Sequence, residues 1–161
     1  MPEWLAPVAL IAATITTGLI AGLFYAFACS VMPALRGTDA RTFVDVMQRI
    51  NRAILNGWFA AAFVGAFVLT ALAAVLHLGE GPVAILVLAA LLLYGAMLAI
   101  TFAVNVPLNN QLDAAGDPSD LADPAAVRNR FERRWVRWNL VRAVTSTAAL
   151  GCLATVLAVV S

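Results

Sequence analysis

Four long stretches without a single charged residue restrict the folds that this chain can adopt. They are residues 4–35, 53–79, 81–112 and 143–161. A helix needs about 20 apolar residues to cross the hydrocarbon core of a bilayer, and each stretch reaches or approaches that length. Hydrophobic residues make up 63% of the chain and charged residues only 12%, whereas soluble domains carry about 25% charged residues. The pattern therefore predicts apolar surface that faces lipid.

Helices are the spanning structure that fits these stretches. In lipid, only helices and closed β-barrels pair all of their backbone hydrogen-bonding groups. Barrel strands alternate polar and apolar residues, and stretches such as 85–93 do not alternate. We therefore expect an all-α integral membrane protein in which one domain, residues 1–161, forms a four-helix bundle. The expected spans are residues 4–32, 54–78, 82–106 and 138–160.

The basic residues predict the orientation of the bundle. All ten are arginines, and they fall within residues 36–52 and 128–142. Because basic residues collect in cytoplasmic loops, we expect a multi-pass protein of the cell membrane whose loops 33–53 and 107–137 are cytoplasmic and whose two termini lie outside. The net charge is only +1 and no nucleic-acid-binding motif accompanies the arginines, so no nucleic-acid partner is expected.

Both cytoplasmic segments have helical character. Pro33 is expected to end the first helix, and Thr38 or Asp39 to cap an amphipathic helix that lies on the membrane surface before the second span. Residues 113–123 are expected to form a flexible polar loop. Asp123 and Pro124 are typical of a helix start. The helical pattern continues from there, so the fourth helix is expected to project into the cytoplasm by about four turns.

The first span carries a ridge of small residues that permits close helix packing. The ridge consists of Gly18, Gly22, Ala26 and Ser30, at four-residue spacing. We expect tight packing inside the bundle, and the Gly18/Gly22 face also offers a surface for an oligomer. Membrane lipid is the expected partner of the remaining apolar surface.

Polar side chains gather at the arginine-bearing end of all four spans. Thr101, Asn105 and Asn109 share one face of the third helix, and Asn139 and Arg142 share one face of the fourth. Convergent polar groups in an apolar bundle are the first place to seek a site. The guanidinium of Arg142 suits an anion or an enolate-like oxygen. The candidate residues are Tyr25, Asn51, Asn56, Asn105, Asn109, Asn110, Glu132, Trp135, Trp138, Asn139 and Arg142.

These residues also have a structural interpretation. Asparagines near helix ends commonly cap backbone groups, and tryptophans such as Trp138 are typical of an interfacial aromatic belt. Arg142 could extend its guanidinium to the interface. For Asn105 and Asn139, hydrogen bonding between helices and contact with a ligand are equally open. His77, at the opposite end, is expected to be a surface residue.

Several classes of function do not fit the sequence. One histidine and two cysteines cannot build a zinc site or a bis-histidine haem site. The chain lacks phosphate-binding and dinucleotide-binding motifs. Transport coupled to protons is disfavoured because the spans contain no acidic residue. We expect neither a metal nor another cofactor.

Four segments resemble the anthrone-oxygenase-like family of bacterial and fungal four-helix membrane proteins. The most specific patterns are Val-Pro-Leu-Asn-Asn at 106–110 and Trp-x-x-Trp-Asn-x-x-Arg at 135–142. The segments are GLFYAFACSVMPAL (22–35), RTFVDVMQRINRAILNGWF (41–59), VNVPLNNQL (104–112) and RRWVRWNLVR (133–142).

The resemblance implies a cofactor-independent oxygenase that converts an anthrone to an anthraquinone with O₂. Such a reaction needs a base, a pocket that stabilises an anion and a flat apolar slot. For this chain the implied base is Glu132, and Trp135 or Trp138 would stack on the rings. The residues implied to stabilise the oxyanion are Asn105, Asn109, Asn139 and Arg142.

Two hypotheses stay open. The first is an oxygenase acting on a planar lipophilic substrate, an anthrone or a quinol-like molecule, that enters from the membrane. The second is a non-enzymatic membrane protein, either a subunit or a lipid- or quinone-binding module, in which the polar cluster holds the bundle together.

Overall fold

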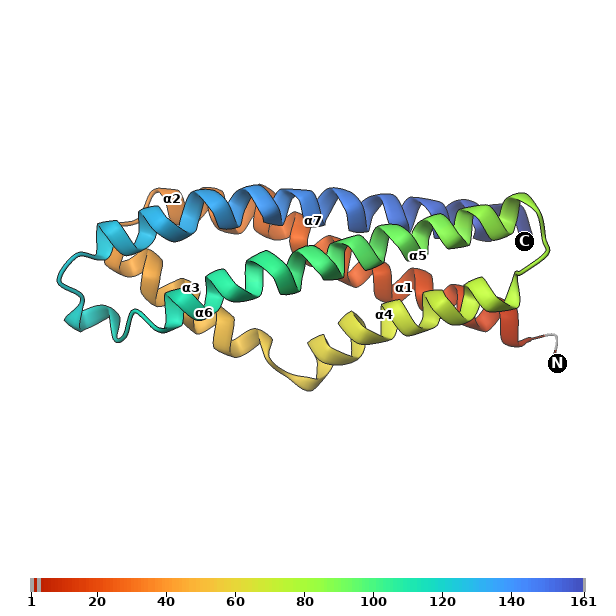
Figure 1. Cartoon of the computed structure of the whole chain (residues 1–161), viewed down its shortest axis with the longest axis horizontal. Helices are drawn as coiled ribbons and strands as arrows, with labels where there is room; N and C mark the ends of the chain where they lie inside the picture. The colour runs from red at the N-terminus through yellow and green to blue at the C-terminus, as the bar shows by residue number, and fades with distance from the viewer. Residues whose placement is uncertain (1, 3, 161) are drawn as a thin grey trace.

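A computed structural model of the chain describes residue 2 and residues 4–160. Within that part all regular structure is helical, and Figure 1 shows an elongated bundle whose full length is followed by α7 (Pro124–Val160). Among the described residues, four helices are long and apolar enough to cross a membrane: Leu5–Arg36, Gly57–Leu76, Pro82–Asp113 and Pro124–Val160. The chain is thus a multi-pass, four-helix membrane bundle, as predicted, and lipid contacts its exposed apolar side chains.

The first long helix continues through Pro33, so the prediction that Pro33 ends it is wrong. It comprises α1 (Leu5–Ala26), the π-helical segment η1 (Phe27–Val31) and α2 (Met32–Arg36). In a regular helix the proline ring would clash with the carbonyl four residues earlier. The wider π turn removes that conflict, because the N–H of Met32 pairs with the carbonyl of Phe27, five residues back.

The third long helix repeats this arrangement. It comprises α5 (Pro82–Ile100), the π-helical segment η2 (Thr101–Asn105) and α6 (Val106–Asp113). The N–H of Val106 pairs with the carbonyl of Thr101, and Pro107 follows. The helix therefore extends to Asp113, beyond the expected span and into the segment predicted to be a loop.

The amphipathic helix α3 (Ala40–Ile54) packs into the bundle instead of lying flat on the membrane surface. Its N-cap is Asp39, whose carboxylate accepts hydrogen bonds from the backbone N–H groups of Arg41 and Thr42. Phe43 and Met47 are fully buried in a core shared with α2, α6 and α7. Figure 1 shows α3 running lengthwise beside α6, because its apolar face finds partners there.

A second core joins α1, α4 (Gly57–Leu76), α5 and α7 in the apolar half of the bundle. Tyr94 is fully buried in it and donates a hydrogen bond to the carbonyl of Phe63, 2.9 Å away. His77 ends α4 and is buried, with Nδ1 2.8 Å from the carbonyl oxygen of Ala73. The prediction of a surface histidine is therefore wrong, because the side chain folds back onto its own helix.

The small-residue ridge is used inside the bundle at Gly18. A Cβ atom at Gly18 would lie 3.6 Å from Leu150 of α7, whereas one at Gly22 would meet nothing within 4 Å. Gly18 therefore faces α7 at an ordinary van der Waals distance, and an oligomer through this face stays a prediction.

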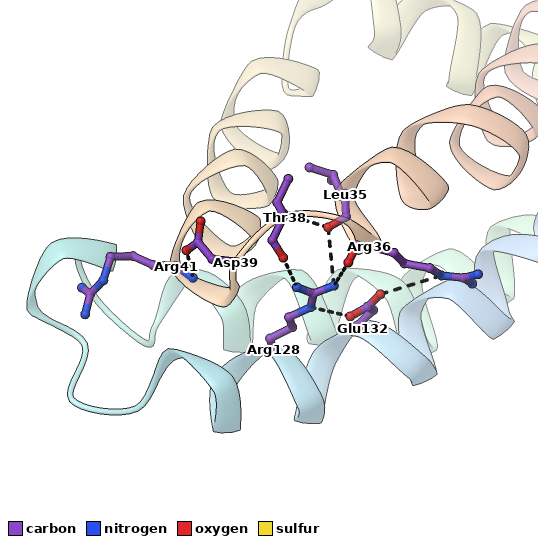
Figure 2. A network of polar contacts seen from close by, with 7 residues as sticks. All are labelled: Leu35, Arg36, Thr38, Asp39, Arg41, Arg128 and Glu132. Carbon is purple, nitrogen blue, oxygen red and sulfur yellow. Dashed lines mark hydrogen bonds and ion pairs between the residues drawn. The ribbon is translucent and has the colours of Figure 1, made fainter.

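Arg128 ties the end of α2 to the start of α7 (Figure 2). Its guanidinium donates hydrogen bonds to the carbonyls of Thr38 at 2.7 Å, Arg36 at 3.3 Å and Leu35 at 3.4 Å. It also pairs with Glu132 at 2.6 Å. The carbonyls at a helix C-terminus lack intrahelical partners, so this cation satisfies them and complements the helix dipole.

Candidate functional site

A cavity of about 310 Å³ lies beside the bend between α3 and α4, and we call it the bend cavity. Figure 1 shows α3 and α4 meeting at an angle that points away from α5 and α6. Asn56 holds the bend: its side chain accepts a hydrogen bond from the N–H of Phe59 and donates one to the carbonyl of Ala53. The volume falls within the range of small-molecule sites.

Helices α1, α3, α4, α6 and α7 and both π segments supply the walls of the bend cavity. The polar lining residues are Asn51, Thr101, Asn105, Asn109, Asn110, Asp113, Asn139 and Arg142. The lining is otherwise apolar, with aromatic side chains from Phe24, Phe27, Phe59, Phe63, Phe102 and Trp135. Such a mixture suits a flat apolar molecule that carries a few polar groups.

Arg142 is a buried cation at the wall of this cavity. Its Nη2 donates a hydrogen bond to Oδ1 of Asn139 at 2.9 Å, and Asn139 donates to the carbonyl of Phe24 at 3.1 Å. The guanidinium carbon lies 4.3 Å from the ring centroid of Phe24 and 5.5 Å from that of Trp135. No carboxylate in the described part of the chain forms an ion pair with it.

This environment favours an anion beside Arg142. Removing a cation from water is costly unless it is paired, and cation–π contacts recover only about 0.5–2 kcal/mol each. Arg142 as a whole is 6% exposed, so the structure holds its side chain inside the bundle rather than extended to the interface. A negative charge in the bend cavity would supply the missing partner.

Three polar atoms on the lining residues have no hydrogen-bond partner. They are Nε of Arg142, Nδ2 of Asn51 and Oδ1 of Asn105. Asn105 Nδ2 lies 3.5 Å from the carbonyl of Trp135, which explains why its oxygen faces elsewhere. An unsatisfied buried polar atom costs about 1–3 kcal/mol. A ligand with both acceptor and donor groups would satisfy these two donors and one acceptor.

Trp135 forms a rigid part of the wall. Its indole N–H donates a hydrogen bond to Oδ1 of Asn109 at 2.8 Å. Its ring centroid lies 5.6 Å from that of Phe27 and 5.9 Å from that of Phe131. The hydrogen bond and the two ring contacts fix the indole between α6, η1 and α7, so it can present the same surface to any ligand.

An aromatic wall lines the side of the cavity near α4. The rings of Phe59 and Phe63 stack at 5.0 Å, and Phe102 meets Phe63 edge-on at 6.2 Å. Leu55 is 81% exposed and Phe102 63% exposed. Because these exposed lining residues are apolar, the cavity has an apolar opening on the side of the bundle.

Comparison with known proteins decides the family. The model of a family described as anthrone oxygenase matches residues 56–152. This chain belongs to the anthrone oxygenase family. The match confirms the resemblance seen in the sequence patterns, and it includes Asn105, Trp135 and Arg142. No curated protein and no solved structure matches the chain.

For this anthrone oxygenase family member, the structure brings most of the predicted site residues to one cavity. Seven of them line it: Asn51, Asn105, Asn109, Asn110, Trp135, Asn139 and Arg142. They come from α3, η2, α6 and α7, segments that are far apart in the sequence. Their convergence is a property of the packing, because spacing along one helix says nothing about which neighbour it faces.

The structure places four predicted site residues away from the bend cavity. Tyr25 is 63% exposed on the outside of α1, and Asn56 uses its side chain to hold the α3–α4 bend. Trp138 is half-buried and does not line the cavity. Glu132 pairs with Arg128 and lies 4.0 Å from Arg36, facing the end of α2. It therefore does not line the bend cavity.

Sequence reasoning missed Asp113 and the phenylalanines of the lining. Asp113 follows Thr101, Asn105 and Asn109 by a further four residues, and that spacing was the available signal. Its place at the start of the polar segment 113–123 predicts a loop residue instead. The phenylalanines gave no separate signal, because an aromatic residue in an apolar span is equally compatible with a core or a lipid-facing position. Among the described residues, no group of His, Cys, Asp or Glu could hold a metal ion.

Proposed function

We propose that this protein is an oxygenase that oxidises a planar, lipid-soluble anthrone-like substrate with O₂ in the bend cavity. The observation that carries the proposal is Arg142, a buried cation that forms no ion pair with a described carboxylate, in the wall of a cavity with one polar and one apolar, aromatic side. The family supports the class of reaction. The unpaired atoms of Asn51 and Asn105 support a substrate with oxygen substituents.

The reaction replaces a CH₂ group of the substrate by C=O and converts O₂ into that oxygen and one water. A base removes one C–H proton, and the electron pair stays on the rings as an anthrolate with much of its charge on oxygen. The anthrolate gives one electron to O₂. The resulting radical and superoxide join in a C–O bond, and the peroxide anion takes up a proton. Loss of the second C–H proton with O–O cleavage leaves C=O and releases hydroxide, which combines with a proton to form water.

Arg142 acts on the first of these steps. The ketone is neutral before deprotonation and the anthrolate oxygen is negative afterwards, so a fixed cation stabilises the product of deprotonation more than the substrate. The hydrogen bond to Asn139 and the contact with the Phe24 ring hold the guanidinium in place. A preorganised donor in a water-poor site needs little reorganisation as the charge develops.

The opening on the flank of the bundle suits a substrate dissolved in lipid. Leu55 and Phe102 present apolar side chains there, and the rings of Phe59 and Phe63 line the path inward. A flat aromatic molecule would exchange lipid contacts for contacts with these rings. The polar end of the cavity then receives its oxygen atoms.

O₂ uptake by the purified protein in detergent tests the proposal, with a model anthrone as substrate and autoxidation as the baseline. We expect uptake above the baseline in the wild type and a fall of about 10²-fold or more in the Asn139→Ala/Arg142→Ala variant, which is the scale expected for loss of an oxyanion-stabilising donor. Arg137→Ala, an exposed position on the same helix, should retain the wild-type rate.

Two results would overturn the proposal. One is no uptake above autoxidation by folded wild-type protein. The other is equal uptake by the wild type and the double variant. Binding of an anthraquinone or a quinone without turnover would instead favour the non-enzymatic binding module, because the bend cavity would then hold a ligand that it does not convert.

A further inference from the structure

We propose that Asp113 is the proton acceptor of the bend cavity: it takes up the proton that the substrate loses and passes it to solvent. This inference rests on the proposed function and names a residue for its first step. It also replaces Glu132, whose carboxylate pairs with Arg128 near the end of α2 and does not line the bend cavity.

The composition of the lining leads to Asp113 by elimination. Within the described part of the chain, the lining of the bend cavity contains two ionisable side chains, Arg142 and Asp113. A guanidinium carries its proton throughout the physiological range and cannot accept another. A carboxylate in reach of the substrate, directly or through one water, is the usual alternative to histidine as a general base.

The position of Asp113 suits proton transfer to solvent. Thr101, Asn105, Asn109 and Asp113 all line the cavity at four-residue spacing along η2 and α6. Thr101 and Asn105 are buried, whereas Asp113 is exposed. The rise from Asn105 to Asp113 is about 12 Å along a regular helix. The polar strip therefore runs from the buried end of the cavity, where the unpaired atoms lie, to a carboxylate in contact with water.

The backbone around Asp113 is held in place from α3. Gln48, which is buried, donates hydrogen bonds to the carbonyls of Leu112 at 2.9 Å and Gly116 at 3.0 Å, on either side of Asp113. The N–H of Gly116 bonds to the carbonyl of Asp113. Asp113 thus has a fixed place at the edge of the cavity although it ends a helix.

Charged groups of both signs lie on the neighbouring elements: Arg49 of α3 is paired with Asp45, and Asp117 and Asp120 follow Asp113 along the chain. Arg49 and Arg52 of α3 act electrostatically on Asp117, four residues beyond Asp113. Arg130 of α7 lines an adjoining cavity together with Ala114 and Ala115. Arg142 lies in the wall of the bend cavity itself.

The test compares wild type with Asp113→Asn, which keeps the size of the side chain and removes the base. Asp120→Asn, at the end of the short 3-10 helix η3 (Pro118–Asp120) outside the cavity, is the matched control. We expect Asp113→Asn to lower kcat for a model anthrone by about 10²-fold or more, to leave KM nearly unchanged, and to increase the isotope effect when the reacting CH₂ is deuterated. Asp113→Glu should recover part of the rate.

The pH profile separates proton transfer from a structural role. In the wild type, kcat should fall at acid pH as the carboxylate is protonated. In the Asn variant, kcat should no longer show this fall at acid pH. The deficit of the variant should shrink at alkaline pH, where hydroxide replaces the base. Unchanged kcat, isotope effect and pH profile in Asp113→Asn would overturn this inference while leaving the oxygenase intact. Absence of turnover by the wild type would instead contradict the proposed function on which this inference rests.

Discussion

Nη2 of Arg142 donates a hydrogen bond to Oδ1 of Asn139, 2.9 Å away and one turn earlier on α7. The amide nitrogen of Asn139 in turn donates to the carbonyl of Phe24 on α1. The two residues therefore connect α7 to α1 at the wall of the bend cavity and aim a cation whose Nε has no partner. Buried polar groups are nearly always hydrogen-bonded, so the unpaired Nε supports the proposed ligand at this wall.

Replacing Arg142 by methionine should separate stability from activity. The substitution removes a buried, unpaired charge, and apolar replacements of buried charges are often neutral or stabilising by about 1–4 kcal/mol. We expect Arg142→Met to unfold at the same or a higher temperature in detergent, while O₂ uptake with an anthrone falls to the autoxidation rate. Unfolding followed by circular dichroism, beside the oxygen electrode, checks both. A large loss of stability would show that Arg142 serves the bundle rather than a ligand.

Arg128 should be the structural counterpart of Arg142. It satisfies carbonyls at the end of α2 and pairs with Glu132, so Arg128→Met should cost about 2–3 kcal/mol in the free energy of unfolding. Arg49→Met removes an exposed ion pair with Asp45 and should change stability little. Chemical unfolding of the two variants measures the difference. Equal effects would contradict the anchoring role of Arg128.

Acid should weaken the start of α3. Hydrogen bonding by the Thr42 hydroxyl, followed by the Thr42 backbone N–H, lowers the pKa of Asp39. A carboxyl group whose pKa is lower in the folded than in the unfolded protein stabilises the fold above its unfolded pKa of about 3.9. That contribution is lost as the pH falls through the folded pKa. Asp39→Asn keeps a capping oxygen and should abolish this part of the acid dependence of the unfolding temperature. If the unfolding temperature of the Asn variant falls with acid as much as that of the wild type, Asp39 is not the source of the acid dependence.

Cysteine labelling should decide the orientation. The background protein has Cys29 and Cys152 replaced by alanine. In it, a cysteine that replaces Ser119 after α6 is expected to react with a membrane-impermeant maleimide only after cells are permeabilised. A cysteine at Leu78, in the turn after α4, is expected to react in intact cells. These outcomes follow from the arginines at the Ser119 end. The reverse pattern would invert the topology and place the bend cavity at the outer end.

The sequence alone determined the number and type of the membrane-spanning elements, because hydrophobic length is a property of the chain in one dimension. Charge-free stretches long enough to cross a bilayer must become helices whatever their neighbours are. Periodicity likewise placed Asn105 with Asn109, and Asn139 with Arg142, on shared faces. The patterns around these residues were also sufficient to indicate the family.

Tertiary packing decided which of these faces meet and what they enclose. Pro33 and Pro107 do not end their helices, because the π-helical segments η1 and η2 before them accommodate the backbone hydrogen bonds that proline cannot form. Asn105, which lies in η2, lines the cavity. Glu132 shares a helix with Arg142 yet pairs with Arg128 beside α2, whereas Asp113 lines the same cavity as Arg142. The neighbour that a side chain meets depends on helix crossing and on the bend after Ile54, which arise only when all four helices pack together.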